Sequence, residues 1–305
     1  MPELPEVQTT VNGINATVKG RTITDVWTEY NSPLKMHKGS IKEPLFFKQF
    51  KKKIIGEKIL RAERRAKNIL IHLTGNHTIL MHMKMTGHLM YGTYEFNTKQ
   101  NKWTPTDEGP LTDPFNAHLR LVFSLENGKH LAFSDVRKFG KVTIEDTDKI
   151  FSSLHLKHLG PEPLDTTFTA EKFIQRIQTK PKGKIKSVLM DQTVISGIGN
   201  IYSDEMLWLS NVHPLSIVSN IPEKNMKLMY TGMKTVLEKG IDFGGDSTSD
   251  YRNIKGERGK FQAAHNAYKM NKTKCKKRGC PGILQRLVVG GRSAHFCPVH
   301  QILNK

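Results

Sequence analysis

The spacing of the hydrophobic residues changes once along this chain, and that change constrains the fold most. From about residue 20 to residue 150, short runs alternate between apolar and polar residues, among them Ile69–Leu73, Thr78–Met83 and His118–Phe123. Such alternation is typical of β-strands with one buried face, and Asn127-Gly128 predicts a tight hairpin. After Gly160-Pro161-Glu162-Pro163 the spacing becomes helical. Strands followed by helices predict an α+β protein of two domains.

A helix is expected before the first strand. Gly20 ends a pattern in which apolar residues recur at spacings of three and four, at Leu4, Val7, Val11, Ile14 and Val18. This pattern predicts an amphipathic helix that packs one face against the strands. We therefore predict that residues 1–150 form a β-sandwich domain with one leading helix.

The remainder divides into a linker, a helical domain and a terminal segment, predicted at residues 151–165, 166–261 and 262–305. Helical spacing within the second domain covers Thr169–Thr179, Ile185–Met190, Ile201–Leu209 and Met226–Glu238. A stretch rich in Gly, Ser and Asp, from Asp242 to Gly259, has no periodicity and predicts a long loop. Loops of this length inside a compact domain are usually functional or disordered.

The charge of the chain favours a polyanionic partner. Its 305 residues contain 47 Lys and Arg against 28 Asp and Glu, a formal net charge of +19. Nucleic acid is the commonest partner for such an excess, although charge that serves only solubility is the simpler alternative. No apolar run suggests a membrane span and no amphipathic aromatic face suggests a membrane surface. The N-terminus lacks the pattern of a secretory signal, so we expect an intracellular protein.

The cysteines are few and confined to the C-terminal segment. Cys275 and Cys280 form one pair, and Cys297 with His300 forms a second pair sixteen residues later. Two such pairs predict a tetrahedral zinc site on a β-hairpin, and four protein ligands predict a structural rather than a catalytic ion. The alternative is three buried free cysteines. Several Lys and Arg residues near Cys275 suggest that phosphates lie close by.

The first six residues, Met1-Pro2-Glu3-Leu4-Pro5-Glu6, suggest chemistry at the N-terminus. Removal of Met1, which a small second residue favours, exposes the secondary amine of Pro2 beside the Glu3 carboxylate. At neutral pH roughly a fifth of an α-amino group is unprotonated, against about a thousandth of a lysine. Pro2 is then a nucleophile toward an aldehyde-like carbon, and its Schiff base is a permanently charged iminium. The alternatives are a frayed terminus and ordinary helix initiation.

Further motifs in both halves of the chain suggest contacts to nucleic acid. Gly197-Ile198-Gly199-Asn200 precedes a predicted helix, with Asn200 as the expected N-cap; the free N–H groups of such a helix bind anions. Together with the helix predicted at Ile185–Met190, it forms a helix–two-turn–helix. Arg292 follows two glycines at the predicted hairpin tip and has the fork geometry for a phosphate.

In the first half, Met85, Arg137 and Phe139 lie where strands run into turns, and such side chains can wedge into a base stack. The simpler alternative places Met85 and Phe139 in the core. Lys67, just before a strand, has the alternative of a solvated basic face.

Taken together, the motifs resemble those of the formamidopyrimidine-DNA glycosylase/endonuclease VIII family of base-excision repair enzymes. The resemblance spans essentially the whole chain and rests on these motifs in this order: Pro2-Glu3-Leu4-Pro5-Glu6-Val7, Lys67, Met85-Thr86-Gly87, Asp135-Val136-Arg137-Lys138-Phe139-Gly140, Gly197 to Glu205, and Gly290-Gly291-Arg292-Ser293 with Cys297-Pro298 and His300-Gln301. It implies a β-sandwich domain, a helix–two-turn–helix domain with a zinc finger, and double-stranded DNA held between them.

The resemblance also implies a role for each site residue. Pro2 attacks C1′ of the damaged nucleotide, Glu3 acts as general acid or base at the sugar, and Glu6 supports it. Lys67 donates a proton and contacts phosphate, Asn200 and Arg292 hold phosphates that flank the lesion, and Arg292 assists δ-elimination. Met85, Arg137 and Phe139 fill the space that the flipped nucleotide leaves. The loop at about residues 244–260 covers the flipped base.

Two features refine the resemblance. The Pro-Glu-Leu-Pro-Glu opening and the Arg137-x-Phe139 wedge match the formamidopyrimidine type, which removes oxidised purines such as 8-oxoguanine and formamidopyrimidines. The predicted zinc ligands depart from the family's usual four cysteines, because they are three cysteines and His300, with a longer first spacing. The turn before Cys275 also lacks the usual glycine and arginine.

We accordingly predict a monomeric bifunctional DNA glycosylase/AP lyase that forms a Schiff base through Pro2 and cuts the strand by β,δ-elimination. It is expected to carry one structural zinc ion and to work at intracellular DNA, in the nucleoid or, in a eukaryote, the nucleus. One alternative is endonuclease VIII-like activity on oxidised pyrimidines or single strands. The other is a zinc-finger protein that binds damaged DNA without cutting it.

Overall fold

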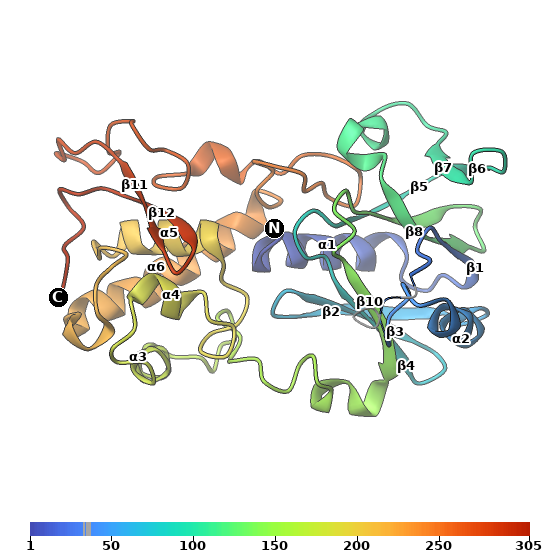
Figure 1. Cartoon of the computed structure of the whole chain (residues 1–305), viewed down its shortest axis with the longest axis horizontal. Coiled ribbons are helices and arrows are strands. Elements are labelled where there is room, and N and C mark those ends of the chain that lie inside the picture. Colours follow the sequence, from blue (N-terminus) through green and yellow to red (C-terminus); the bar gives the residue numbers. More distant parts are fainter. Residues whose placement is uncertain (33, 35–37) are drawn as a thin grey trace. The chain divides into compact units, whose positions relative to one another are not determined.

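The computed structural model describes residues 1–32, 34 and 38–305 and separates into two compact units. The first unit contains Met1–Lys157 and Phe243–Lys260, and the second contains His158–Asp242 and Phe261–Lys305. The chain thus leaves the second unit and returns to it. Each unit is described by itself; the elements are labelled in Figure 1.

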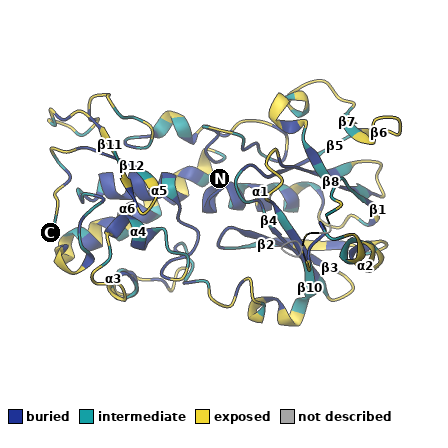
Figure 2. Cartoon of the chain, viewed as in Figure 1, coloured by how far each residue is buried: buried dark blue, intermediate teal, exposed yellow. Residues whose placement is uncertain are grey.

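Two four-stranded antiparallel sheets build the first unit (Figure 1). One has the order β1-β8-β9-β5 and the other the order β10-β4-β3-β2. Their strands are β1 (Ile23–Thr28), β2 (Ile59–Arg65), β3 (Asn68–Leu73), β4 (His77–His82), β5 (His88–Gly92), β8 (Leu119–Leu125), β9 (His130–Ser134) and β10 (Lys141–Asp146). Residues from both sheets, such as Phe123 and Ile71, share one core. Most residues of β3, β4, β5, β8 and β9 are buried, whereas β1, β2 and β10 each bury only two residues (Figure 2). The predicted β-sandwich is confirmed.

The leading helix is also confirmed. Helix α1 (Leu4–Thr17) places Val7, Val11 and Ile14 in the core between the sheets, which is the face that the sequence pattern selects. Gly20 follows the helix with a φ of +82°, a backbone conformation that glycine adopts without steric cost. One face of α1 is therefore fixed by the sandwich along much of its length.

The first unit contains elements that the strand pattern did not predict. Helix α2 (Pro44–Ile54) lies between β1 and β2, with Phe50 and Ile54 fully buried. Phe46 and Phe47 stack on Phe50, with ring centroids 6.5 and 6.4 Å apart. These side chains recur at helical spacing within a region dominated by alternation, so the prediction of a single helix missed it. A small hairpin, β6 (Tyr94–Asn97) and β7 (Lys102–Pro105), is likewise additional.

The second unit is helical with a C-terminal hairpin. Its elements are α3 (Ala170–Gln178), α4 (Ile185–Leu189), α5 (Asn200–Leu209), α6 (Glu223–Asp242), β11 (Gln285–Val289) and β12 (Arg292–Phe296). Short 3-10 turns complete the two units at Pro110–Thr112, Pro114–Asn116, Thr147–Ser152, Val218–Asn220 and Phe261–Ala264. The predicted helices and hairpin are all present. None of the helices in the described parts of the chain is long and apolar enough to cross a bilayer.

The segment Phe243–Lys260 packs with the first unit, whereas we had placed it in the helical domain. Tyr251, Arg252 and Ile254 are buried in it, and Ile254 belongs to the sandwich core. The carbonyl of Ile254 accepts a hydrogen bond of 2.8 Å from the backbone N–H of Tyr91 in β5. Because these buried anchors are isolated in a Gly- and Ser-rich stretch, they gave no periodic signal. We refer to Phe243–Lys260 as the returning loop.

Candidate active site

The N-terminus is held firmly within the first unit. Met1 is 37% exposed, whereas Pro2 and Glu3 directly after it are buried. Glu3 is the N-cap of α1, and its backbone N–H donates to Oε2 of Glu6 at 2.7 Å, one half of a capping box. Pro5 occupies the first turn, where its missing N–H costs nothing. The N-terminal residues are therefore ordered, and the alternative of a frayed terminus is wrong.

Glu6 also joins the N-terminus to the returning loop. Its Oε1 accepts a hydrogen bond of 2.8 Å from the backbone N–H of Asp246. The Tyr251 hydroxyl donates to the Glu6 carbonyl at 3.0 Å. Gly245 has a φ of +87°, and a Cβ there would lie 3.0 Å from Cγ of Glu6. The sequence suggested Glu6 only as a supporting carboxylate; here its two oxygens connect segments that are 240 residues apart.

Lys67 lies in the tight turn between β2 and β3 and is only 5% exposed. Ala66 before it has a φ of +55°, which turns the chain sharply at this point. The alternative of a solvated basic face is therefore wrong for Lys67. A buried ammonium group requires partners or an incoming anion, and it lies where the family resemblance expects a phosphate contact.

His82 lies beside this turn, and sequence reasoning missed it. It ends β4 and pairs in register with Asn68, the residue after Lys67. Burial, together with the positive charges of Lys84 and Lys67, lowers the pKa of His82 to about 3. The backbone N–H of Lys84 donates to Nδ1 at 3.0 Å, so the neutral ring carries its proton on Nε2. A histidine that ends a strand directly before the Met85 turn was the available signal.

The predicted wedge residues lie on two turns of the first unit. Met85 is half-buried, whereas Arg137 is exposed and Phe139 is 50% exposed. The Arg137 guanidinium lies 4.5 Å from the centroid of the Phe139 ring, a cation–π contact. The core alternative is thus wrong for Phe139. The three side chains are of the kind that fills a gap in a base stack.

Asp135 fixes the two wedge turns to each other. Its carboxylate is fully buried and accepts hydrogen bonds from the Thr86 hydroxyl and from the backbone N–H of Gly140. The Thr86 oxygen in turn accepts from the backbone N–H of Arg137 at 3.1 Å. Phe133 closes the space beneath, since a Cβ at Gly87 or Gly140 would come within 2.7 or 2.6 Å of its ring. The wedge side chains therefore project from a rigid base.

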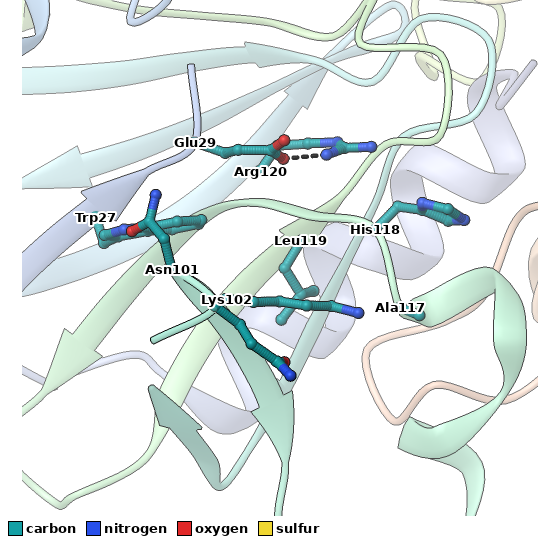
Figure 3. Close-up of a pocket in the computed structure, with 9 residues that line it drawn as sticks. Trp27, Glu29, Asn101, Lys102, Ala117, His118, Leu119 and Arg120 are labelled. Atoms are coloured by element: carbon teal, nitrogen blue, oxygen red, sulfur yellow. Dashed lines mark hydrogen bonds and ion pairs between the residues drawn. The ribbon is translucent and has the colours of Figure 1, made fainter. Parts of the chain in front are cut away.

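A cavity of about 370 Å³ lies behind this base, with Trp27 and His118 among its lining residues (Figure 3). Arg120 lines it, ion-pairs with Glu29 and donates through Nε to the Asp135 carbonyl at 2.9 Å. Lys138 of the wedge turn also contacts Glu29, at 3.0 Å. The cavity contains none of the predicted site residues; its charged pair braces the wedge turn from the opposite side.

In the second unit, Asn200 begins α5, but it is not the N-cap that the sequence predicted. Gly199 takes that position, because its extended backbone (φ −136°) needs no side chain to start the helix. Asn200 is half-buried, and its Oδ1 has no hydrogen-bond partner among the described residues. This buried oxygen is therefore not used to cap the helix.

Arg292 is exposed at the start of β12, directly after the hairpin turn. Gly290 and Gly291 in that turn have φ values of +55° and +74°, which explains the paired glycines. A Cβ at Gly290 would lie 2.8 Å from Oγ of Ser187 in α4. The hairpin tip thus lies against α4, and both phosphate candidates of this unit, Asn200 and Arg292, belong to one compact body.

The predicted metal ligands form a single cluster. The ligand atoms of Cys275, Cys280, Cys297 and His300 all lie within 4.8 Å of one another. Sγ of Cys280 is 3.6 Å from Sγ of Cys297, and Nδ1 of His300 is 3.4 Å from Sγ of Cys275. Bonds of about 2.3 Å from zinc to sulfur would give tetrahedral edges of roughly 3.8 Å, so the donor set fits a zinc ion.

The surroundings of the cluster support metal binding. Nε2 of His300 lies 3.2 Å from the carbonyl of Trp208, which fixes the ring so that Nδ1 faces the cysteines. Backbone N–H groups of Lys277 and Gly282 point to Cys275 and Cys280, each with a nitrogen–sulfur distance of 3.4 Å. Cys275, the ligand with the unusual spacing, is thus part of the cluster. The three cysteines lie together and are not separate residues of the core.

Glu205 is a structural residue whose role sequence reasoning missed. It is buried in α5 and accepts four hydrogen bonds, two of them from the backbone N–H groups of Ala267 and Tyr268 at 2.9 Å. These groups precede the metal cluster, at the place where the usual glycine–arginine turn is absent. A carboxylate that receives several N–H donors holds such a segment in place without it.

Comparison with known proteins agrees with this arrangement. The family model described as the formamidopyrimidine-DNA glycosylase N-terminal domain matches residues 1–142, and the model for the H2TH domain of the same enzyme matches residues 159–252. The formamidopyrimidine-DNA glycosylase of Pediococcus pentosaceus is 33% identical, with 99% of this chain and 100% of the relative covered. That of Bacillus subtilis is also 33% identical, with 97% and 98% covered.

Solved structures give the same result. The Lactococcus lactis Fpg protein in complex with DNA that contains an abasic site has a TM-score of 0.81 at 29% identity, covering 98% of this chain and 99% of that one. A variant of it, bound to DNA that contains Fapy-dG, agrees equally well. The same protein bound to DNA with an oxidised pyrimidine has a TM-score of 0.80, with the same identity and coverage. This chain belongs to the formamidopyrimidine-DNA glycosylase family.

Proposed function

We propose that this protein is a DNA glycosylase with AP lyase activity that excises oxidised purines from double-stranded DNA. The observation that carries the proposal is the buried Pro2-Glu3 terminus, which Glu6 locks to the returning loop. Relatives that match over the full chain are named formamidopyrimidine-DNA glycosylases, and the similar structures hold DNA with Fapy-dG or an abasic site.

The proposed reaction begins after Met1 has been removed, because the nitrogen of Pro2 is otherwise an amide. The Pro2 nitrogen forms a bond to C1′ as the bond from C1′ to the damaged base breaks, and the base leaves with a proton. Glu3, buried beside Pro2, transfers protons at the sugar and opens its ring. The resulting iminium accepts electrons, so that loss of a C2′ proton expels the 3′ phosphate by β-elimination and loss of the C4′ proton then expels the 5′ phosphate by δ-elimination. Water hydrolyses the remaining Schiff base, which frees Pro2 and the unsaturated sugar fragment.

The remaining site residues would position the DNA. Lys67 and the Nε2–H of His82 would supply donors in the first unit, and the side-chain NH₂ group of Asn200 and the guanidinium of Arg292 would supply them in the second. Phosphate contacts of this kind position DNA without reading its sequence. Met85, Arg137 and Phe139 would occupy the space of the extruded nucleotide, and the returning loop would lie over its base.

We further propose that the cluster of Cys275, Cys280, Cys297 and His300 holds one structural zinc ion. Three thiolates and an imidazole suit this metal, and a closed set of four protein ligands leaves no position for a substrate. Burial lowers the pKa of His300, which keeps its ring neutral and able to bind a metal. The ion would order the finger that carries Arg292, and no step of the reaction passes through it. The enzyme would act as a monomer on intracellular DNA.

Oxidised pyrimidines are a second candidate substrate class. The structure of the similar Lactococcus lactis Fpg protein has been solved in complex with DNA that contains an oxidised pyrimidine. A binding protein without catalysis is the remaining alternative, and it would need no free amine on Pro2.

Borohydride trapping tests all three possibilities. The mature protein is incubated with duplexes that contain 8-oxoguanine, Fapy-dG or an oxidised pyrimidine, and borohydride reduces the iminium to a stable adduct. We expect the purine lesions to trap most rapidly. Pro2→Gly and a form that retains Met1 should bind DNA and trap little. Binding without an adduct for every lesion would establish the non-catalytic alternative.

A further inference from the structure

Three buried titratable side chains in the second unit have no part in the proposed chemistry. Asp204 in α5 and Lys186 in α4 are fully buried, and His295 in β12 is 4% exposed. Sequence reasoning quoted Asp204 within a motif but gave it no role. We refer to Lys186, Asp204 and His295 as the buried triad.

The first arm of the buried triad reaches the helix that Asn200 begins. Nζ of Lys186 lies 2.5 Å from Oδ1 of Asp204. The same ammonium group donates to the hydroxyl of Ser203 at 3.1 Å and to the carbonyl of Asn200 at 3.3 Å. All three protons of this ammonium therefore point to the first turn of α5, and one of them contacts Asn200 itself.

The second arm reaches the strand that Arg292 begins. Oδ2 of Asp204 accepts a hydrogen bond of 3.0 Å from the backbone N–H of His295 and lies 2.9 Å from its Nδ1. His295 is three residues after Arg292 in β12, and its ring also contacts Tyr268, with centroids 5.3 Å apart. The carboxylate of Asp204, on α5, thus joins the helix that Asn200 begins to the strand that Arg292 begins.

A contribution to folding stability does not by itself explain why these charged side chains are buried. Removing two charges from water costs about as much as their attraction returns, so a buried ion pair contributes little net stability compared with apolar residues of the same size. Hydrogen bonds in fixed directions do specify relative position, however. In the buried triad both carboxylate oxygens of Asp204, which lies on α5, are used: Oδ1 accepts from Lys186 in α4 and Oδ2 accepts from His295 in β12.

We propose that Asp204 is a positioning residue that holds Asn200 and Arg292 at the separation needed to grip the phosphates beside the lesion. Lys186 and His295 are the two arms through which it acts. The inference rests on the proposed function, and it adds to it a determinant of DNA affinity that touches no DNA. The affinity for any DNA with correctly spaced phosphates would depend on Asp204, whichever lesion the DNA contains.

The test is the paired variant Lys186→Met with Asp204→Asn, which keeps the net charge and the approximate volume. The exposed ion pair of Lys180 and Asp191 supplies a matched control, with Lys180→Met and Asp191→Asn in the same unit. Each protein is titrated with a duplex that contains a stable abasic-site analogue over a range of salt concentrations. Zinc content and melting temperature are recorded for each variant.

We expect the triad variant to bind about tenfold or more weakly, and its plot of log Kd against log salt to flatten by about one phosphate contact. The control pair should remain within about twofold of wild type in both respects. At saturating DNA the trapping rate should change less than the affinity does, because Pro2 and Glu3 lie in the other unit.

A double-mutant cycle with Arg292→Ala separates positioning from general structure. If Asp204 acts through Arg292, then Arg292→Ala should cost much less affinity in the triad variant than in wild type. Additive losses, or an unchanged salt slope, would overturn the proposal. If the paired variant loses zinc or melts early, His295→Gln, which alters only one arm, replaces it under the same criteria.

Failure of the proposed function would be distinguishable from failure of this inference. The proposed function fails when the mature wild-type protein traps no lesion. The positioning role is measured by equilibrium binding to an uncleavable duplex and needs no turnover.

Discussion

Glu6 is a residue whose two oxygens serve distant parts of the sequence, the N-terminal turn and the returning loop. Both donors are backbone N–H groups, so the side chain must be a double acceptor. Glutamine has nearly the same shape but presents one NH₂ group, which would face one of these N–H groups. Replacing one carboxylate oxygen with an NH₂ group would therefore remove one of the two hydrogen bonds through which Glu6 joins the N-terminal turn to the returning loop.

We therefore predict that Glu6→Gln loosens the returning loop and slows base excision about tenfold or more, the size expected when a buried hydrogen bond to a charged group is lost. Strand cutting at a preformed abasic site should slow less, since no base needs to be covered. Limited proteolysis should show new cleavage between residues 243 and 260. Glu63→Gln, on the exposed side of β2, serves as control, and equal slowing of both reactions would contradict the prediction.

His88 gives a prediction about pH. Burial lowers its pKa to about 4, although a hydrogen bond of 2.8 Å to Asn116 opposes the shift. An unfolded histidine titrates near 6.5, so below that pH the unfolded chain binds a proton that the folded chain does not. The stabilising contribution is present above pH 6.5 and is lost as the pH falls toward 4.

Replacing His88 with Gln should remove this dependence while keeping a donor to Asn116. Between pH 7 and pH 5 the wild-type protein should lose about 2 kcal/mol more unfolding free energy than the variant does. Urea unfolding at the two pH values measures the difference, with the exposed His158→Gln as control. Equal losses in both proteins would show that His88 is not the group responsible.

At the scale of elements, the wedge turns illustrate how one aromatic ring supports two loops. Gly87 and Gly140 both pack against Phe133, so any side chain at either position must displace it. We predict that Gly140→Ala lowers stability by about 1–3 kcal/mol through overpacking and weakens discrimination of the base opposite the lesion. Adding Phe133→Leu should restore part of the loss by making room. Thermal melting and excision from duplexes with different opposite bases measure the two effects.

The finger is a second element with a direct test. Cys275→Ser, Cys280→Ser and His300→Ala should each lower the bound zinc well below one ion per chain, because each removes one of four ligands. DNA affinity should fall in parallel, since β12 carries Arg292. The first unit should keep its own fold. Full zinc content in Cys275→Ser would remove that cysteine from the ligand set.

The elements also show what the sequence could and could not predict. Helix α1 buries one face, so the spacing of its apolar residues predicts it, and β4 is predicted by a short apolar run that follows a turn. Helix α2 was missed because its aromatic residues lie inside a region of alternation. Gly199 rather than Asn200 caps α5, since a glycine cap depends on backbone geometry that composition does not reveal. The buried triad depends on residues that come together only after α4, α5 and β12 have packed.

At the scale of the whole molecule, the net charge of +19 predicts strong salt dependence. If six or more phosphates are neutralised, affinity for duplex DNA should fall about a thousandfold or more between 50 and 200 mM salt. Fluorescence anisotropy with lesion-containing and intact duplexes measures the two slopes. A similar decline for both would show that phosphate contacts dominate, while a flat response would contradict the proposed contacts.

The proposed site residues could be selected from the sequence because they lie in short motifs, whereas the division into units could not be predicted. Pro2, Lys67, Asn200 and Arg292 are recognisable one by one, and the metal ligands by their spacing. The returning loop is contiguous with the helical unit in sequence, and only its buried Tyr251, Arg252 and Ile254 assign it to the sandwich.

That assignment has a consequence for how the protein is made. The first unit cannot be completed until residue 260 has left the ribosome, because Phe243–Lys260 supplies part of its interior. At about 5–20 residues per second, the N-terminus waits unsupported for many seconds while the rest of the chain is synthesised. Met1 is accessible to processing throughout that interval, before Glu6 finds its partner in the loop. Slow assembly of the sandwich thus gives the cell time to remove Met1 and expose the proposed nucleophile, Pro2.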